Sequence, residues 1–193
     1  MRKIIVTEYV TVDGVMEDPG GQKGGRGGWS RPFWSEDAGK YKFDELFAAD
    51  ALLLGRTTYE GFAAAWPNYK DEAGFADRMN NMPKYVVSTT LENPVWNNTR
   101  VIKGDVAEAV RELKQSEGLS ILVAGSSQLV HTLRQLDLVD EYRLMVHPVI
   151  LGGGLPLFRD DAATTTRLKL LGTQNLPKGI VVLTYAPDRE QGQ

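Results

Sequence analysis

Predicted strands and helices alternate through the first 135 residues, and this alternation restricts the fold more than any other feature of the sequence. Apolar and β-branched residues predict strands in five segments: 4–12, 51–54, 84–88, 99–103 and 119–124. Apolar spacing and capping residues predict helices in five others: 35–49, 57–65, 75–82, 105–116 and 125–136. Strands dominate after that, at 141–148, 168–173 and 180–185.

This order predicts the α/β class, with a mostly parallel central sheet covered by helices and antiparallel strands added at the C-terminal end. No repeat or linker divides the 193 residues, so we expect a single domain over 1–187 and a disordered tail over 188–193. No apolar stretch approaches the length of a transmembrane helix, and the N-terminal apolar segment is too short for a signal peptide. We therefore expect a cytoplasmic protein without membrane contact.

The content of charged and reactive residues excludes several functional classes. The formal net charge is −3 and no basic patch is present, which argues against nucleic-acid binding. There is no cysteine, so disulfides, thiolate metal sites and cysteine nucleophiles are excluded. The two histidines, His131 and His147, are far apart in sequence. We predict that both are structural and expect no metal site.

Three predicted strands end in the same way, with small and hydroxylated residues that open a loop or a helix. The segments are LLLGRTTYE (52–60), VVSTT (86–90) and LVAGSSQ (122–128). In open α/β sheets, ligands bind beyond the carboxyl ends of the strands, where helix N-termini offer N–H groups to phosphate. Arg56 adds a planar, permanently charged group that suits phosphate. Together these segments predict a site for a ligand with more than one phosphate.

Each segment also has a simpler interpretation. Gly55 can end a strand, and Thr57 or Thr58 can cap a helix, without any ligand. The turn at Gly125 has neither the G-x-G-x-x-G spacing of a Rossmann motif nor the lysine of a Walker loop. A Rossmann site and a P-loop phosphotransferase are therefore not supported. Because the pattern recurs at three strand ends, the sequence favours a nucleotide.

The motifs and their order resemble the dihydrofolate-reductase-like superfamily, and most closely the branch with the reductase domain of the riboflavin-biosynthesis deaminase/reductase. The segments that carry the resemblance span nearly the whole chain: TVDG (11–14), LLLGRTTYE (52–60), VVST (86–89), LVAGSSQLVHTL (122–133), VDEYRLMVHPVILGGGLPLF (139–158) and IVVLTY (180–185). The resemblance implies a three-layer α/β/α fold and an NADPH-dependent reductase. It also implies a homodimer formed through sheet edges or C-terminal strands.

The resemblance further implies which residues bind NADPH. They come from three turns: Gly55, Arg56, Thr57 and Thr58; Ser88 and Thr89; and Gly125, Ser126 and Ser127. The first turn would contact the phosphates and the third would approach the pyrophosphate. Ser88 and Thr89 would lie with Arg56 near the adenosine 2′-phosphate, which predicts NADPH rather than NADH.

Candidates for the substrate end of the site each keep two interpretations. Asp13 matches the aspartate of the family's S-L-D-G pattern and could orient the nicotinamide or the substrate, or simply end the strand. Asp37, on the first predicted helix, is a second catalytic candidate, although a solvated first-turn carboxylate is more ordinary. Trp29 and Trp34 could stack on a planar substrate or cover the edge of the core.

Two segments resemble the active-site loops of folate reductases. The glycine-rich segment 17–32 takes the place of the flexible lid, and 152–158 takes the place of the loop that packs against it.

Two functions remain open at this point. One is an NADPH-dependent reductase of a small pteridine-like or aminopyrimidine-like metabolite, and the other is an NADPH-binding module without turnover.

Overall fold

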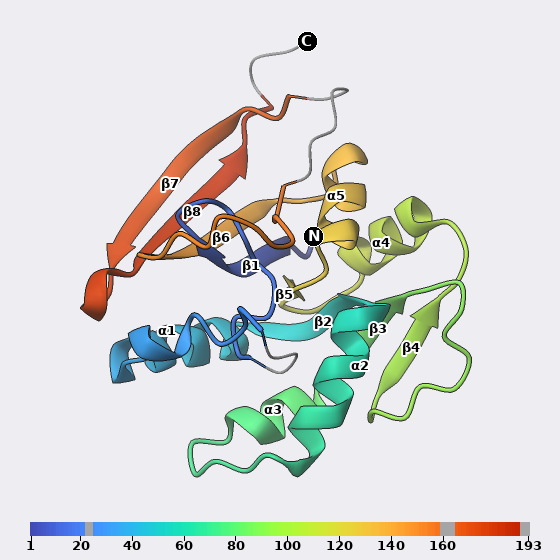
Figure 1. Ribbon diagram of the computed structural model, residues 1–193. Helices are drawn as coiled ribbons and strands as arrows, with labels where there is room; N and C mark the ends of the chain where they lie inside the picture. Colours follow the sequence, from blue (N-terminus) through green and yellow to red (C-terminus); the bar gives the residue numbers. More distant parts are fainter. Residues whose placement is uncertain (22–24, 159–164, 190–193) are drawn as a thin grey trace.

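The computed structural model describes residues 1–21, 25–158 and 165–189, and Figure 1 shows their arrangement. The described strands form one sheet in the order β4-β3-β2-β5-β1-β6-β8-β7. Their bounds are β1 (Ile4–Thr11), β2 (Ala49–Gly55), β3 (Lys84–Val87), β4 (Thr99–Ile102), β5 (Ser120–Ala124), β6 (Glu141–His147), β7 (Leu168–Asn175) and β8 (Val181–Pro187). From β4 to β6 in this order all neighbours are parallel, whereas β8 and β7 pair antiparallel. The predicted sheet is confirmed.

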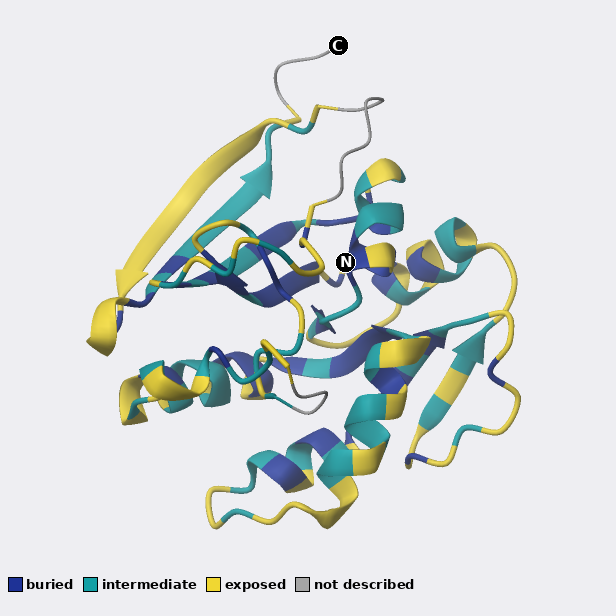
Figure 2. Ribbon diagram, in the orientation of Figure 1, coloured by how far each residue is buried: buried dark blue, intermediate teal, exposed yellow. Residues whose placement is uncertain are grey.

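Helices cover both faces of the sheet, which gives three layers (Figure 1). Their bounds are α1 (Glu36–Phe47), α2 (Arg56–Ala65), α3 (Phe75–Asn81), α4 (Val106–Gln115) and α5 (Ser127–Gln135), with 3₁₀ turns η1 (Arg31–Phe33), η2 (Trp66–Asn68) and η3 (Pro177–Gly179). On β1, Ile4 and Val6 join the core formed with α4 and α5, whereas Ile5 joins the core formed with α1, α2 and α3. The central strands are therefore buried on both faces, as Figure 2 shows, which explains their continuous apolar sequences.

Two predicted helix boundaries are wrong, and strand pairing explains both. The helix predicted to be capped by Thr57 or Thr58 begins at Arg56, with Gly55 in the N-cap position. Strand β2 pairs with β3 as far as Gly55, so the helix follows the strand without a loop. The first helix ends at Phe47 rather than near 49, because β2 already begins at Ala49.

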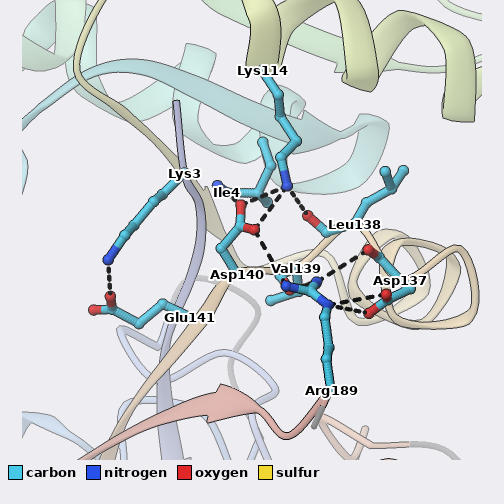
Figure 3. A network of polar contacts seen from close by, with 9 residues as sticks. All are labelled: Lys3, Ile4, Lys114, Asp137, Leu138, Val139, Asp140, Glu141 and Arg189. Carbon is cyan, nitrogen blue, oxygen red and sulfur yellow. Dashed lines mark hydrogen bonds and ion pairs between the residues drawn. The ribbon is translucent and has the colours of Figure 1, made fainter. Parts of the chain in front are cut away.

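Hydrogen bonds and ion pairs connect the amino end of β1 to α4 and to the C-terminal segment (Figure 3). Asp140 accepts from the backbone N–H of Ile4 at 2.8 Å and from Lys114 Nζ at 2.8 Å. Arg189, which falls in the predicted tail, donates from Nε to the Asp137 carboxylate at 3.0 Å. Residues 190–193 of that tail lie outside the described residues. This network lies at the end of the sheet away from the turns predicted to bind a ligand.

No helix among the described residues combines the length and the apolar character needed to cross a membrane.

Candidate functional site

A cleft of about 890 Å³ opens at the carboxyl ends of β1, β2, β3 and β5. All the residues predicted to bind a cofactor line it: Gly55, Arg56, Thr57, Thr58, Ser88, Thr89, Gly125, Ser126 and Ser127. The parallel arrangement of the strands causes this convergence, because their carboxyl ends share one edge of the sheet. The prediction that these three turns meet agrees with the structure. What they bind remains a prediction.

The turn between β2 and α2 and the turn between β5 and α5 are joined by one hydroxyl group. The backbone N–H of Gly55 donates to Ser126 Oγ at 2.8 Å, and Ser126 Oγ donates to Thr58 Oγ1 at 2.9 Å. Gly125 has φ +62°, and a Cβ there would lie 2.7 Å from Thr58 Oγ1. Glycine is therefore required at 125 both by the left-handed backbone and by the closeness of the two turns.

The helices that begin at the cleft lack side-chain caps. Helices α1 and α4 begin elsewhere, and Ser35 and Asp105 accept the N–H groups of Ala38 and Glu108 at 3.2 and 3.1 Å. Helices α2 and α5 begin at the two joined turns without any side-chain cap bond. Their first-turn N–H groups and the positive ends of their dipoles are thus available at one cleft, which is a favourable arrangement for an anion.

Arg56 places a positive charge at the rim of the same cleft. Its Nη1 donates to Thr90 Oγ1 at 2.6 Å, and its Nε pairs with Glu60 Oε1 at 2.7 Å. The Arg56 side chain is 47% exposed, so this ion pair is screened by solvent and leaves the guanidinium accessible. Ser88 Oγ accepts from the N–H groups of Thr90 and Leu91 at 3.2 and 3.0 Å, which fixes the turn after β3.

Glu8 is a buried carboxyl group of the cleft that the sequence interpretation missed. Its side chain is on β1, and the residue is 5% exposed. Oε2 accepts from the backbone N–H of Gly125 at 3.0 Å, whereas Oε1 has no hydrogen-bond partner among the described residues. Burial raises the pKa of Glu8 well above its ordinary value of 4.5, and the Gly125 N–H and the charge of Lys42 offset this only in part.

A buried ion pair from α1 lies on the other face of β1. Lys42 Nζ donates to Thr7 Oγ1 at 2.6 Å and to Glu45 Oε2, and Thr7 Oγ1 lies 2.7 Å from the same Glu45 oxygen. Burial opposes the ionisation of Glu45, but Lys42, Thr7 and Arg143 outweigh it and hold the pKa of Glu45 below its ordinary value. Thr7, Lys42 and Glu45 line the cleft, whereas Arg143 does not. One wall of the cleft is therefore charged and hydrogen-bonded.

A sequence signal existed for these missed residues. Glu8 interrupts the apolar residues Ile4, Val6 and Val10, which share its face of β1. A carboxylate inside such a strand is unusual and marks a candidate site. In α1, Phe47 is 41% exposed, whereas Glu45 is 4% exposed. Glu45 thus lies with Leu46 on the inner face of α1, whereas Lys40 and Asp44 are exposed.

The two catalytic candidates from the sequence, Asp13 and Asp37, do not line the cleft. The Asp13 carboxylate accepts from Thr11 Oγ1 at 2.6 Å and from the N–H groups of Gly152 and Leu151 at 2.8 and 3.2 Å. These hydrogen bonds, that from Thr11 above all, lower the pKa of Asp13. The Asp13 carboxylate thus holds the loop at Leu151 and Gly152 to the end of β1. Asp37 is exposed in the first turn of α1.

The two tryptophans predicted to contact substrate also lie outside the residues that line the cleft. Trp29 is 7% exposed, donates from Nε1 to the Glu17 carbonyl at 2.8 Å and packs edge-on against His147 with ring centroids 5.2 Å apart. It therefore covers the core, which was the alternative interpretation. Trp34 is 64% exposed on the surface. Their role in substrate binding stays a prediction that this geometry does not support.

The two predicted active-site loops do contact each other. The backbone N–H of Leu155 donates to Glu17 Oε2 at 3.1 Å, and Arg26 Nη1 donates to the carbonyl of Leu151, the residue before the second loop, at 3.1 Å. Between them lies a smaller cavity of about 390 Å³. Glu17, Asp18, Pro19 and Gly20 also line the large cleft, so this loop forms part of its wall. Residues 22–24 of the loop lie outside the described residues.

Sequence comparison finds related chains over almost the full length. A family model described as the RibD C-terminal domain matches residues 2–182. The uncharacterized protein YyaP of Bacillus subtilis (strain 168) is 33% identical over 187 residues, which cover 95% of this chain and 94% of that protein.

Comparison with solved structures finds the same fold. A putative riboflavin biosynthesis protein from Shewanella sp. PV-4 superposes with a TM-score of 0.78 at 19% identity, covering 97% of this chain and 99% of that chain. Dihydrofolate reductase from Enterococcus faecalis, solved in complex with NADP(H) and RAB-propyl, gives a TM-score of 0.63 at 16% identity and covers 96% of each chain. The dihydrofolate-reductase-like α/β fold expected from the sequence is confirmed.

Proposed function

Because the chain belongs to the RibD C-terminal domain family, we propose that it is an NADPH-dependent reductase of a small pteridine-like or aminopyrimidine-like metabolite. One observation carries the proposal: two helices without side-chain caps begin side by side at one cleft, with Arg56 at its rim. This arrangement suits a ligand that carries more than one phosphate group. The bound NADP(H) of the Enterococcus faecalis enzyme, which has a similar fold, supports the choice of cofactor.

The residues of the cleft fit this cofactor by their chemistry. The N-termini of α2 and α5, joined through Ser126, would hold the pyrophosphate. Arg56, with Ser88 and Thr89, would hold the 2′-phosphate, because a guanidinium pairs with phosphate through two parallel hydrogen bonds. When bound, reduced nicotinamide supplies a hydride to the substrate.

The loop that includes Glu17 and Asp18 has the position of a lid. It forms one wall of the cleft and is hydrogen-bonded to the neighbouring loop at Leu155. Its proposed role is to exclude water while hydride is transferred, since water competes for reactive groups and weakens electrostatic interactions.

NADPH oxidation in the presence of a panel of dihydropteridines and ribosylaminopyrimidine phosphates tests this function. We expect tight NADPH binding and turnover with at least one compound. Tight binding without turnover on any compound would favour the binding module without turnover. Absence of NADPH binding would contradict both functions.

A homodimer belongs to the same proposal. Strand β7 is at the edge of the sheet and is exposed along its whole length, with Leu170 and Leu171 each 52% exposed. Figure 2 shows this exposed strand at the outside of the sheet. An exposed edge strand offers unpaired N–H and C=O groups and apolar side chains to a second copy.

A further inference from the structure

Among the described residues that line the cleft, Glu8 has a buried carboxyl oxygen without a partner, namely Oε1. We propose that Glu8 is the proton donor of the reduction and delivers the proton on Oε1 to a nitrogen or oxygen atom of the substrate. This inference rests on the proposed function and names the group that completes its chemistry.

The hydrogen bond to Gly125 fixes which oxygen carries the proton. Oε2 accepts from the Gly125 N–H at 3.0 Å, so a proton on Oε2 would compete with this donor. The proton of the neutral carboxyl therefore lies on Oε1. Oε1 then becomes a buried hydrogen-bond donor, on a residue that lines the cleft, and the described residues provide no acceptor for it. A substrate carbonyl or imine group supplies such an acceptor.

Burial favours the neutral form of Glu8 and outweighs the charges around it. From α1, Lys42 attracts the ionised form and Glu45 repels it, but Lys42 is already paired with Glu45. From β6, Arg143 is paired with Glu141 at 2.7 Å and lies 3.5 Å from Glu45.

Two further carboxyl groups of the cleft come from the lid loop. Glu17 and Asp18 line the same cleft, and the turn after β5 contributes only the uncharged N–H of Gly125. Burial is the largest influence on Glu8, and it raises the pKa of the carboxyl well above the ordinary value.

The hydrogen bond to Gly125 gives Oε2 a structural role, but it does not account for the unpaired Oε1. The residues on the same face of β1, Ile4, Val6 and Val10, are all buried in the apolar core. An apolar side chain at position 8 would continue that core without an unpaired Oε1, although the Gly125 N–H would then lose its acceptor. Native proteins rarely leave such atoms without a partner, and they concentrate raised carboxyl pKa values at functional sites.

The proposed step balances in atoms and electrons. The carbon of a substrate C=N or C=O bond accepts a hydride, the π electrons of that bond move to nitrogen or oxygen, and this atom takes the proton from Glu8 Oε1. The substrate is reduced by two electrons, at the expense of the reduced nicotinamide that the proposed function supplies. The Glu8 carboxylate then regains a proton from water.

The first test measures the protonation of Glu8 without any ligand. The protein is labelled with carbon-13 at the glutamate carboxyl groups, and the Glu8 resonance is identified by its loss in Glu8→Gln. Glutamine has the shape of a neutral carboxyl and can also accept from Gly125, so the fold is expected to persist. We expect a Glu8 carboxyl that is still protonated at neutral pH. A carboxyl already ionised there would overturn the proposal.

The second test measures turnover with whichever panel compound the wild type reduces. Removing a general acid lowers kcat by about 100-fold or more, so Glu8→Gln should lose this much while its NADPH affinity is unchanged. The kcat of the wild type should fall as pH rises through the pKa of Glu8, and that of Glu8→Gln should lack this decrease. Glu36→Gln, which changes an exposed carboxyl on α1, is the matched control with unchanged kcat.

The outcomes separate the two proposals. A wild type that reduces no compound contradicts the proposed function itself. An active wild type with an equally active Glu8→Gln variant contradicts only the role of Glu8. If Glu8→Gln does not fold, Glu8→Leu removes the acid and continues the apolar face of β1, and a kcat equal to that of the wild type at every pH would likewise overturn the role.

Discussion

At the scale of single residues, Gly125 shows how closely the two turns of the cleft approach. An alanine there would need φ +62° and would place its Cβ 2.7 Å from Thr58 Oγ1. We expect Gly125→Ala to reduce the free energy of unfolding by about 1–3 kcal/mol, because left-handed backbone is strained for residues other than glycine. Urea unfolding measures this.

Gly172→Ala is the matched control for this prediction. Gly172 lies on the exposed strand β7, and a Cβ there would meet no atom within 4 Å. The control should leave stability unchanged or slightly raised, because alanine restricts the unfolded chain more than glycine does. Equal effects of the two substitutions on stability would contradict the close approach of the turns at Gly125 and Thr58.

Two buried carboxyl groups should affect stability with opposite dependence on pH. The pKa of Glu8 is raised in the folded protein, so Glu8 ionises first in the unfolded chain as pH rises above about 4.5. The wild type should therefore lose stability relative to Glu8→Gln as pH rises. Glu45 has a lowered pKa, so Glu45→Gln should lose stability at neutral pH, and this loss should diminish as pH falls. Thermal unfolding of the three proteins across pH checks both directions, and parallel curves would contradict both assignments.

The residue scale is also where sequence interpretation was least complete. Arg56 and the small residues of the turns could be predicted, because a strand that ends in glycine and hydroxyl groups is a local pattern. The interruption of an apolar strand marked Glu8 as unusual, but the contacts of Glu8 and Glu45 could not be predicted, because their partners are distant in sequence: Glu8 bonds to Gly125, and Glu45 bonds to Thr7. Asp13 matched a motif, but the structure shows its carboxylate bound to a neighbouring loop.

At the scale of elements, helices α2 and α5 begin at the cleft without a side-chain cap, whereas α1 and α4, which begin elsewhere, have one. Ser126→Ala removes the hydroxyl that joins their first turns, and we expect a loss of about 1 kcal/mol together with weaker NADPH binding. Ser35→Ala removes the cap of α1 and should cost a similar amount without weakening NADPH binding. Equal NADPH affinity in both variants, measured by calorimetry, would contradict the phosphate role of these turns.

The order and type of the elements could be predicted because apolar periodicity is a local property of the chain. Their ends could not be predicted to the residue, because pairing between strands decides them. Strand β2 continues to Gly55 since Gly55 pairs with Val87 on β3, and this pairing moves the start of α2 to Arg56. Nothing near Gly55 in the sequence contains that information.

At the scale of the whole molecule, the sheet edge formed by β7 is more exposed than the edge formed by β4. Strand β7 presents Leu170 and Leu171 to solvent, and we propose that a second copy covers them. Sedimentation of the wild type should give a dimer, and the double substitution Leu170→Lys and Leu171→Lys should give a folded monomer, because lysine on an edge strand opposes pairing. A monomeric wild type at micromolar concentration would contradict the proposed dimer.

The central claim for the whole molecule is that one cleft binds NADPH through both its helix N-termini and Arg56. Calorimetric titration of NADPH and NADH into the wild type, Arg56→Ala and Arg100→Ala tests it most directly. Arg100 is an exposed arginine on β4 that does not line the cleft, so its removal controls for the change in charge. We predict that Arg56→Ala weakens the binding of NADPH much more than that of NADH, whereas Arg100→Ala weakens the binding of neither. Equal loss for the two cofactors in Arg56→Ala, or no binding of NADPH to the wild type, would contradict it.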